Sequence, residues 1–210
     1  QRLNSFFEPL ESVIAIYNTS TSAFVDTNLD TNEIDGIILS GKNPSEMIYL
    51  PTSGKLYVAQ GGALTYASDF STIESTELGS TGIEEVIVSS NTSNGIIIPG
   101  TTFGGTTGGF GIIKLLFDSI SNKMYAAFSA FDFTSNIKEV NIGNATVAAI
   151  PLLTVNSSAF GDTTIGADGY IYQINRSSSE PSIDVYNPET KALVKSIATE
   201  LPLQSITVVK

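Results

Sequence analysis

The chain carries one segment twice, near its two ends. Residues 14–25, Ile-Ala-Ile-Tyr-Asn-Thr-Ser-Thr-Ser-Ala-Phe-Val, align without a gap on residues 183–194, Ile-Asp-Val-Tyr-Asn-Pro-Glu-Thr-Lys-Ala-Leu-Val. Tyr17 and Tyr186 are equivalent positions in this alignment and stand 169 residues apart. An internal repeat constrains the architecture before any local pattern does, because each copy is expected to fold into the same unit.

The same pattern recurs between the two end copies. Tyr66, Val140 and, within a glycine-rich stretch, Phe103 occupy the place of Tyr17. The five marker positions are separated by 49, 37, 37 and 46 residues, a mean of about 42. A period in the low forties, filled by short strands, is typical of a propeller blade.

A second pattern supplies the other strands of each unit. Residues 54–59, Gly-Lys-Leu-Tyr-Val-Ala, resemble residues 122–127 and 169–174, and residues 94–98 are a degenerate copy. Each copy follows an apolar run, at 47–50, 113–117, 163–165 and 86–88 respectively. Two apolar runs joined by a Gly- or Asn-containing turn predict a β-hairpin. A unit is therefore expected to contain an inner strand, the Leu-Tyr-Val strand, the Val-Tyr-Asn strand and an outer strand such as 192–197.

The two ends of the chain complement each other. Residues 203–209 have the pattern of an inner strand without its partner, and residues 3–7 lie where such a partner would lie. We expect them to pair and to close a composite blade, which would protect two sheet edges. The sequence thus predicts one all-β domain over residues 1–210, a β-propeller of five four-stranded antiparallel blades. A β-sandwich and a fragment of a longer propeller are the alternatives.

Composition excludes several kinds of function. The net charge is −11, which disfavours nucleic acid and anionic membranes as partners. The chain has no Cys and no His, so thiolate metal sites, disulfides and histidine-based triads are excluded. No uncharged apolar run approaches the ~20 residues that a membrane helix needs. The low Lys and Arg content and the surface expected to be rich in Ser, Thr and Asn favour an extracytoplasmic location. Sequons for N-glycosylation begin at Asn18, Asn91, Asn144, Asn156 and Asn175.

Three of these motifs resemble the repeat of YVTN-type β-propellers. They are Gly-x-x-Pro at 41–44, Gly-Lys-Leu-Tyr-Val-Ala at 54–59, and Val-Tyr-Asn-Pro-Glu-Thr-Lys-x-x-Val at 185–194. The resemblance is loose and touches most of the chain. It departs from the family at Asn18, Asn141 and Asn187, where Asp is usual, and in the blade count, which is commonly seven. The resemblance implies an extracytoplasmic binding propeller, and a related superfamily includes lactonases with metal-bound carboxylates. It transfers no catalytic position to this chain.

One acidic segment has the oxygen-rich spacing of a calcium loop. Asp26, Asn28, Asp30 and Asp35 fall among alternating polar residues, and calcium takes six to eight oxygen ligands. An EF-hand-like loop would need Gly where Thr31 stands and Glu where Ile37 stands, and an exposed outer strand gives the same alternation. We therefore expect no metal site here, with calcium as the alternative.

Carboxylates near inner strands are the candidates for an enzyme. Five-bladed propellers can host a glycosidase pair around the central channel, and the acidic residues at that level are Glu46, Glu84, Glu85 and Asp162. Glu84 and Glu85 are adjacent, so both cannot face the channel. We expect these side chains to be solvated loop charges.

The remaining motifs are expected to be structural. The stretch from Gly100 to Gly111 lacks the Lys-Ser/Thr ending of a phosphate loop, because Lys114 comes too late. The aromatic cluster Phe128, Phe131 and Phe133 is expected to fill the core. Five tyrosines recur at equivalent blade positions and are expected to pack between blades with their hydroxyls on polar partners. They are Tyr17, Tyr57, Tyr125, Tyr172 and Tyr186.

The sequence as a whole favours a non-catalytic extracytoplasmic propeller without a cofactor. Its expected partners are a protein or carbohydrate ligand, or further copies in a surface assembly, with no membrane insertion. The alternative is a lactonase-like or glycosidase-like hydrolase with acidic residues at the central channel, and a third reading is one domain of a larger adhesin.

Overall fold

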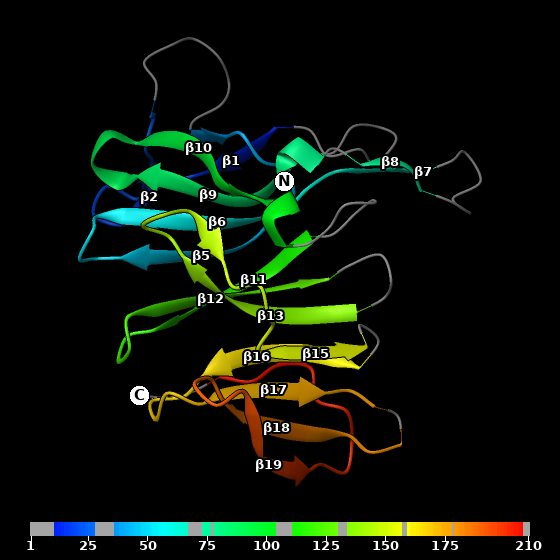
Figure 1. The fold of residues 1–210 in the computed structure, drawn as a ribbon. Coiled ribbons are helices and arrows are strands. Elements are labelled where there is room, and N and C mark those ends of the chain that lie inside the picture. The colour runs from blue at the N-terminus through cyan, green and yellow to red at the C-terminus, as the bar shows by residue number, and fades with distance from the viewer. Residues whose placement is uncertain are drawn as a thin grey trace. The chain divides into compact units, whose positions relative to one another are not determined.

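The computed structural model is all-β, as the sequence predicts. It describes residues 11–27, 36–66, 73–76, 78–103, 111–129, 134–156, 159–177 and 179–207. The chain divides into two compact units, residues 1–113 and 114–210 (Figure 1). A single propeller domain over residues 1–210 stays a prediction. Among the described residues, no helix has the length and apolar character needed to cross a membrane.

The first unit is built around one four-stranded antiparallel sheet. Its strands follow the order β10-β9-β6-β5, and three two-stranded pairs accompany it, β1-β4, β2-β3 and β7-β8. The elements are β1 (Ser12–Ile14), β2 (Tyr17–Asn18), β3 (Ala23–Phe24), β4 (Ile37–Leu39), β5 (Pro44–Leu50), β6 (Lys55–Gly61), β7 (Leu64–Tyr66), β8 (Ile73–Thr76), the 3-10 turn η1 (Leu78–Ser80), β9 (Thr81–Ile87), η2 (Val88–Ser90), β10 (Thr92–Pro99) and η3 (Gly100–Phe103).

The pairing of β9 corrects the sequence prediction. Residues 86–88 and 94–98 were expected to form the inner hairpin of their own blade, but β9 pairs with β6, placing Tyr57 opposite Glu85. The segment around Tyr66 is not the third strand of the sheet, because β7 and β8 form a separate hairpin between β6 and β9. Phe103 lies in the 3-10 turn η3 rather than in a strand. Two of the five predicted blades therefore form a single sheet. The mean spacing of about 42 residues thus does not give the number of blades.

The second unit has the predicted strand order. β11 (Gly111–Asp118) leads into it, and the sheet β11-β12-β13-β14 is extended by β15, which also pairs with β13. The next sheet has the order β16-β17-β18-β19. The elements are β12 (Lys123–Ser129), β13 (Thr134–Asn141), β14 (Thr146–Val147), β15 (Leu153–Asn156), β16 (Phe160–Ile165), β17 (Ile171–Asn175), β18 (Ser182–Asn187) and β19 (Ala192–Ala198).

Each unit has its own apolar core. In the first unit, Ile37, Leu39, Val58 and Val86 are buried together. The cluster of the second unit is larger and comprises Leu116, Tyr125, Ala127, Ile137, Leu152, Leu153, Phe160, Ile171 and Tyr186. The alternating apolar residues of the strands supply these side chains from one face of each sheet.

The repeat found in the sequence is a hairpin with a fixed turn. Its three copies are β2-β3, β13-β14 and β18-β19, with Asn18 opposite Ala23 and Asn187 opposite Ala192. In each copy an Asn side-chain oxygen accepts a backbone N–H three residues later, at 3.0–3.3 Å. A residue in the left-handed region follows four positions after the Asn, namely Ser22, Ala145 and Lys191. Asn tolerates this turn because its side chain replaces a backbone acceptor.

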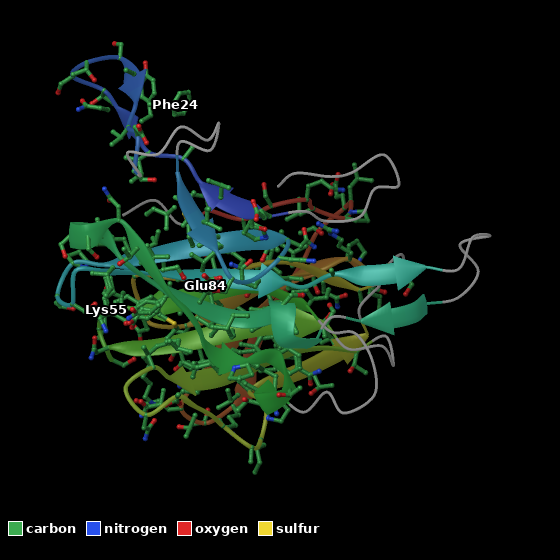
Figure 2. All side chains as sticks on the ribbon, turned by 90° about the horizontal axis from the view of Figure 1, so that it is seen from above. Phe24, Lys55 and Glu84 are labelled. Atoms are coloured by element: carbon green, nitrogen blue, oxygen red, sulfur yellow. The ribbon has the colours of Figure 1, made fainter. Side chains whose placement is uncertain are left out.

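The first copy of this hairpin carries an exposed aromatic pair. Tyr17 and Phe24 face each other across the two strands and are 51% and 64% exposed. Their rings meet edge to face, with centroids 5.4 Å apart. Figure 2 shows Phe24 on this hairpin. The equivalent Tyr186 is buried, so the same turn serves two different surroundings.

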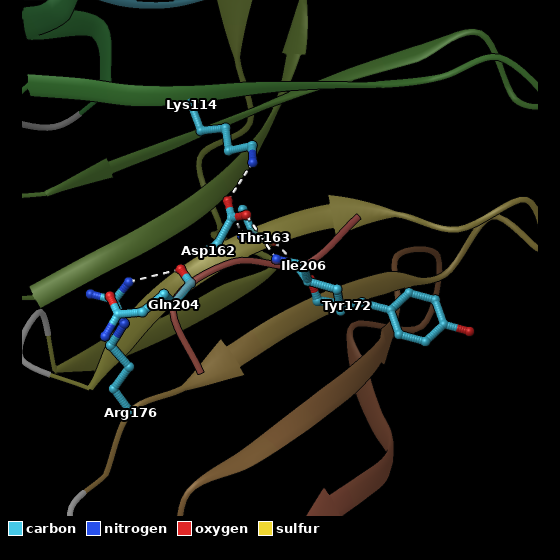
Figure 3. A network of polar contacts seen from close by, with 7 residues as sticks. All are labelled: Lys114, Asp162, Thr163, Tyr172, Arg176, Gln204 and Ile206. Atoms are coloured by element: carbon cyan, nitrogen blue, oxygen red, sulfur yellow. Dashed lines mark hydrogen bonds and ion pairs between the residues drawn. The ribbon is translucent and has the colours of Figure 1, made fainter. Parts of the chain in front are cut away.

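The C-terminal side of the predicted closure forms no strand over its described residues. Leu203–Thr207 carry no strand pairing, and residues 3–7 lie outside the described residues. Side chains hold this segment instead (Figure 3). Arg176 donates to the carbonyls of Leu203 and Gln204 at 3.3 and 3.0 Å, and Asp162 accepts the backbone N–H of Ile206 at 3.1 Å.

Candidate functional site

A pocket in the second unit is formed by three hairpin turns. They are the β11-β12, β16-β17 and β18-β19 turns, and the pocket that they line, here called the turn pocket, has a volume of about 220 Å³. Three carboxylates lie in its wall, one from each turn: Asp118, Asp168 and Glu189.

Local turn chemistry places the first two carboxylates. Asp118 accepts the backbone N–H of Ile120 at 2.9 Å and the Ser121 hydroxyl at 2.5 Å, which closes the β11-β12 turn. Gly169 has φ +79°, a left-handed conformation that favours glycine in the β16-β17 turn. A Cβ on Gly169 would lie 3.8 Å from Oδ2 of Asp118, so these two turns are in van der Waals range of each other.

A tyrosine holds the second carboxylate. The Tyr172 hydroxyl donates to Asp168 at 2.7 Å, and the backbone N–H of Tyr170 donates to the same carboxylate at 3.2 Å. The hydrogen bond to Asp168 is the main reason that the pKa of Tyr172 is raised. Tyr172 was predicted to place its hydroxyl on a polar partner, and this prediction is confirmed.

Tyr125 is the most deeply buried residue of the turn pocket. Only 1% of its surface is exposed. Burial, with added repulsion from Glu139, Asp118 and Glu189, raises its pKa to about 12. The hydroxyl therefore keeps its proton at neutral pH. Among the described residues it has no hydrogen-bond partner, which leaves a donor available to a bound molecule.

The wall of the turn pocket also contains a cation. Lys123 lies in its wall and forms an ion pair with Glu139 at 3.3 Å, with both side chains about 40% exposed. In the described part of the chain, no three Asp or Glu residues are close enough to hold a metal ion. The calcium alternative at Asp26 falls mostly on Asn28, Asp30 and Asp35, which lie outside the described residues.

The carboxylates singled out as an enzyme pair are mostly engaged in internal contacts. Glu84 is fully buried, where a solvated charge was expected. Its carboxylate accepts from the backbone N–H groups of Ser40 and Gly41 at 2.7 and 2.8 Å, from the Gln60 amide at 2.8 Å and from the Ser93 hydroxyl. It joins the β4-β5 connection to three strands of the sheet. Figure 2 marks the position of Glu84.

Glu85 points to the opposite face of β9, as strand alternation predicts. Burial opposes its ionisation, but hydrogen bonds from Lys55 at 2.9 Å and Asn94 at 2.7 Å outweigh burial and lower its pKa. For Asp162, burial likewise opposes ionisation, and hydrogen bonds from Lys114 and the Ile206 backbone lower the pKa. Both carboxyl groups are thus ionised at neutral pH, whereas a general acid needs a raised pKa.

Other predicted residues are placed as follows. Tyr57 and Tyr186 are buried, as expected of packing residues, whereas Tyr17 is half exposed. Phe128 is buried as predicted, but Phe131 and Phe133 lie outside the described residues. Of the glycine-rich stretch, residues 104–110 are likewise outside them. Glu46, on β5, is partly buried.

The turn pocket itself was missed by sequence reasoning. Its three turns were each predicted as hairpin turns, but nothing in the sequence brings them together. The usable signal was one acidic residue in each of three turns, at positions 118, 168 and 189. Their convergence depends on the packing of two sheets.

Comparisons with known proteins give no close relative. No protein-family model and no curated protein matches the chain. Among solved structures, the periplasmic gluconolactonase PpgL of Pseudomonas aeruginosa matches 97% of this chain and 70% of its own, at 10% identity and a TM-score of 0.44. The extracellular domain of the putative one component system BT4673 from B. thetaiotaomicron matches 95% of this chain and 29% of its own, at 12% identity and 0.45.

An exo-β-1,3-galactanase from Phanerochaete chrysosporium is a third similar structure. It matches 75% of this chain, at 10% identity and a TM-score of 0.44. The chain spans about a third of the galactanase's length, 35%. Every one of these TM-scores is below 0.5, so these similarities do not assign the chain to a family. The YVTN resemblance stays a prediction.

Proposed function

We propose that the chain is a non-catalytic, extracytoplasmic β-propeller that binds a ligand in the turn pocket. The observation that carries the proposal is the convergence of three hairpin turns on one pocket with a carboxylate from each. Loops at the ends of a rigid sheet scaffold are where binding residues concentrate.

The propeller part of the proposal rests on strand order. The three sheets of four or more strands in the described part of the chain are antiparallel, and each is built from strands that are nearly consecutive in sequence. This meander is the construction of a propeller blade. The composite blade that both chain ends would complete stays a prediction.

The non-catalytic part rests on the state of the carboxylates. Glu84 has four donors around it, and the pKa values of Glu85 and Asp162 are lowered. The hydrogen-bonding capacity of Glu84 is taken up inside the sheet, and Glu85 and Asp162 are ionised at neutral pH, so none of the three supports the hydrolase alternative.

Binding in the turn pocket can be tested by charge reversal. We would screen soluble peptides, polyamines and oligosaccharides by thermal shift against wild type, Glu189→Lys and Glu180→Lys. Glu180 is an exposed carboxylate of the same unit outside the pocket lining, so it is the matched control. The proposal expects ligands that bind wild type and the Glu180 variant, bind the Glu189 variant more weakly, and are recovered unchanged by mass spectrometry. The proposal would be overturned by ligands that bind the Glu189 variant as strongly as wild type, or by ligands that are converted to product.

Self-assembly is a second candidate, favoured by the last strand. In the described structure β19 pairs only with β18, and Leu193, Val194 and Ile197 are 52%, 56% and 40% exposed. An unpaired apolar edge is a template for another strand, here that of a second copy. Light scattering after size exclusion should then show a dimer that Val194→Lys converts to monomer, and a wild-type monomer at all concentrations would reject this candidate.

A further inference from the structure

The wall of the turn pocket is rich in acceptors. Asp118, Asp168 and Glu189 each carry two oxygens with about four lone-pair sites, more than their internal hydrogen bonds occupy. Glu189 is exposed, and no hydrogen bond of its side chain to the described residues is seen. Such a wall repels anions and favours a ligand that donates hydrogen bonds.

The floor of the same pocket offers the opposite chemistry. Tyr125 is 99% buried. Some polar side-chain atoms of the described residues are both fully buried and without a hydrogen bond, but the Tyr125 hydroxyl is not one of them. The hydroxyl therefore reaches the pocket as a proton donor without a described partner. A buried donor left unpaired costs free energy that a ligand acceptor would recover. An ammonium group or a metal ion has no lone pair to offer to this donor.

A ligand that suits both the wall and the floor of the turn pocket must have groups that can each donate and accept hydrogen bonds. We propose, on the basis of the proposed function, that the turn pocket binds a neutral saccharide. Its hydroxyls donate to Asp168 and Glu189 and accept from Tyr125. Each sugar hydroxyl has one donor and two lone pairs, which fits this mixture. Tyr170 and Pro188 add apolar surface for the C–H faces of the ring.

The volume limits the size of the bound part. At about 220 Å³ the turn pocket is smaller than the roughly 300–1,000 Å³ typical of pockets for drug-sized ligands. One sugar ring is therefore the unit that the pocket recognises, with any further rings outside it.

Removal of one oxygen atom tests the inference. Methyl pyranosides of the gluco, manno, galacto and xylo series, with glucuronic acid and spermidine as charged probes, would be titrated by saturation-transfer NMR. We expect at least one neutral glycoside to bind and glucuronic acid to be excluded. Tyr125→Phe should weaken glycoside binding about tenfold, equivalent to about 1.4 kcal/mol. It should not lower the melting temperature, because the hydroxyl has no described internal partner whose hydrogen bond would be lost.

Tyr57→Phe is the matched control. Tyr57 holds the equivalent position in the first unit, opposite Glu85 as Tyr125 is opposite Glu139, and its hydroxyl interacts with Glu85. This variant should bind the glycoside as wild type does. If only spermidine binds, and the Glu189 reversal abolishes it, the saccharide inference is wrong and the proposed function stands. If neither the glycosides nor any screened ligand depends on the pocket, both are wrong. Glycoside binding that Tyr125→Phe leaves unchanged would also overturn the inference.

Discussion

Glu84→Gln tests whether a buried carboxylate holds the first sheet together. Each of its oxygens accepts two hydrogen bonds, Oε1 from Ser40 and Ser93 and Oε2 from Gly41 and Gln60. A glutamine amide replaces one of these oxygens by an NH₂ group, which cannot accept. Whichever oxygen is replaced, the two hydrogen-bond donors that it served then face the NH₂ group, which is itself a donor.

Two of the four donors can adapt to the amide. The Ser93 hydroxyl can turn and accept, and the Gln60 amide can flip to present Oε1, which now lacks a partner. The backbone N–H groups of Ser40 and Gly41 cannot adapt. One of them is therefore stranded in every arrangement of Glu84→Gln.

The stranded N–H sets the size of the effect. A hydrogen bond to a charged group contributes about 1.5–3 kcal/mol, so we expect Glu84→Gln to lower the free energy of unfolding by about 2–3 kcal/mol. For a chain of this length, that equals a fall in melting temperature of roughly 4–12 °C. Glu84→Ala strands all four donors and should cost about 3–5 kcal/mol.

Urea unfolding monitored by circular dichroism is the assay. The control is Glu46→Gln, the same chemical change on the partly buried edge strand β5, and we expect it to alter the free energy of unfolding by less than about 0.5 kcal/mol. A loss below about 1 kcal/mol for Glu84→Gln, or equal losses for both variants, would refute the reasoning, because desolvation of the carboxylate would then cancel its hydrogen bonds.

Three further predictions concern backbone conformation and charge. Lys191 has φ +58°, so Lys191→Gly should raise the free energy of unfolding by about 0.5–1 kcal/mol in urea titrations; a loss would show that the turn is not strained. A Cβ at Gly82 would clash with the Ile98 carbonyl oxygen, so Gly82→Ala should lower the free energy of unfolding by more than about 2 kcal/mol. Gly54 has open space around it, so Gly54→Ala should lower the free energy of unfolding by only about 1 kcal/mol. Equal losses would contradict the clash. Asp162 has a folded-state pKa below its ordinary 3.8, so its stabilisation is present above that pH and lost as the pH falls through the folded-state pKa. Asp162→Asn should therefore be less stable than wild type at pH 7, with a difference that vanishes in strong acid, and a difference independent of pH would refute this.

Local turn chemistry made part of the fold predictable. The Asn turn that begins at Asn187 and the glycine turn at Gly169 depend on a few neighbouring residues, and the strands on either side were placed correctly. The apolar runs likewise identified most of the longer strands. These features are local, so a single sequence contains them.

Strand partners were not predictable in the same way. Residues 81–87 have the apolar pattern of an inner strand, yet β9 pairs with β6 rather than starting a new sheet. The hairpin β7-β8 lies in the chain between β6 and β9, and closing a longer connection costs little more entropy than closing a short one. Nothing in the apolar alternation distinguishes these two pairings.

Recurrence in the sequence has a different meaning at different copies. The sequence argument assigned all recurring Tyr and Asn residues to packing and turns. Tyr57 fits this reading, since its hydroxyl interacts with Glu85. Tyr125 and Asn187 are repeat residues of the same kind, but both line the turn pocket. What differs is the neighbourhood, because in the second unit two other turns meet the repeat. A repeat residue is thus free to take part in binding wherever packing leaves its polar group without an internal partner and in reach of a pocket, as it does for Tyr125.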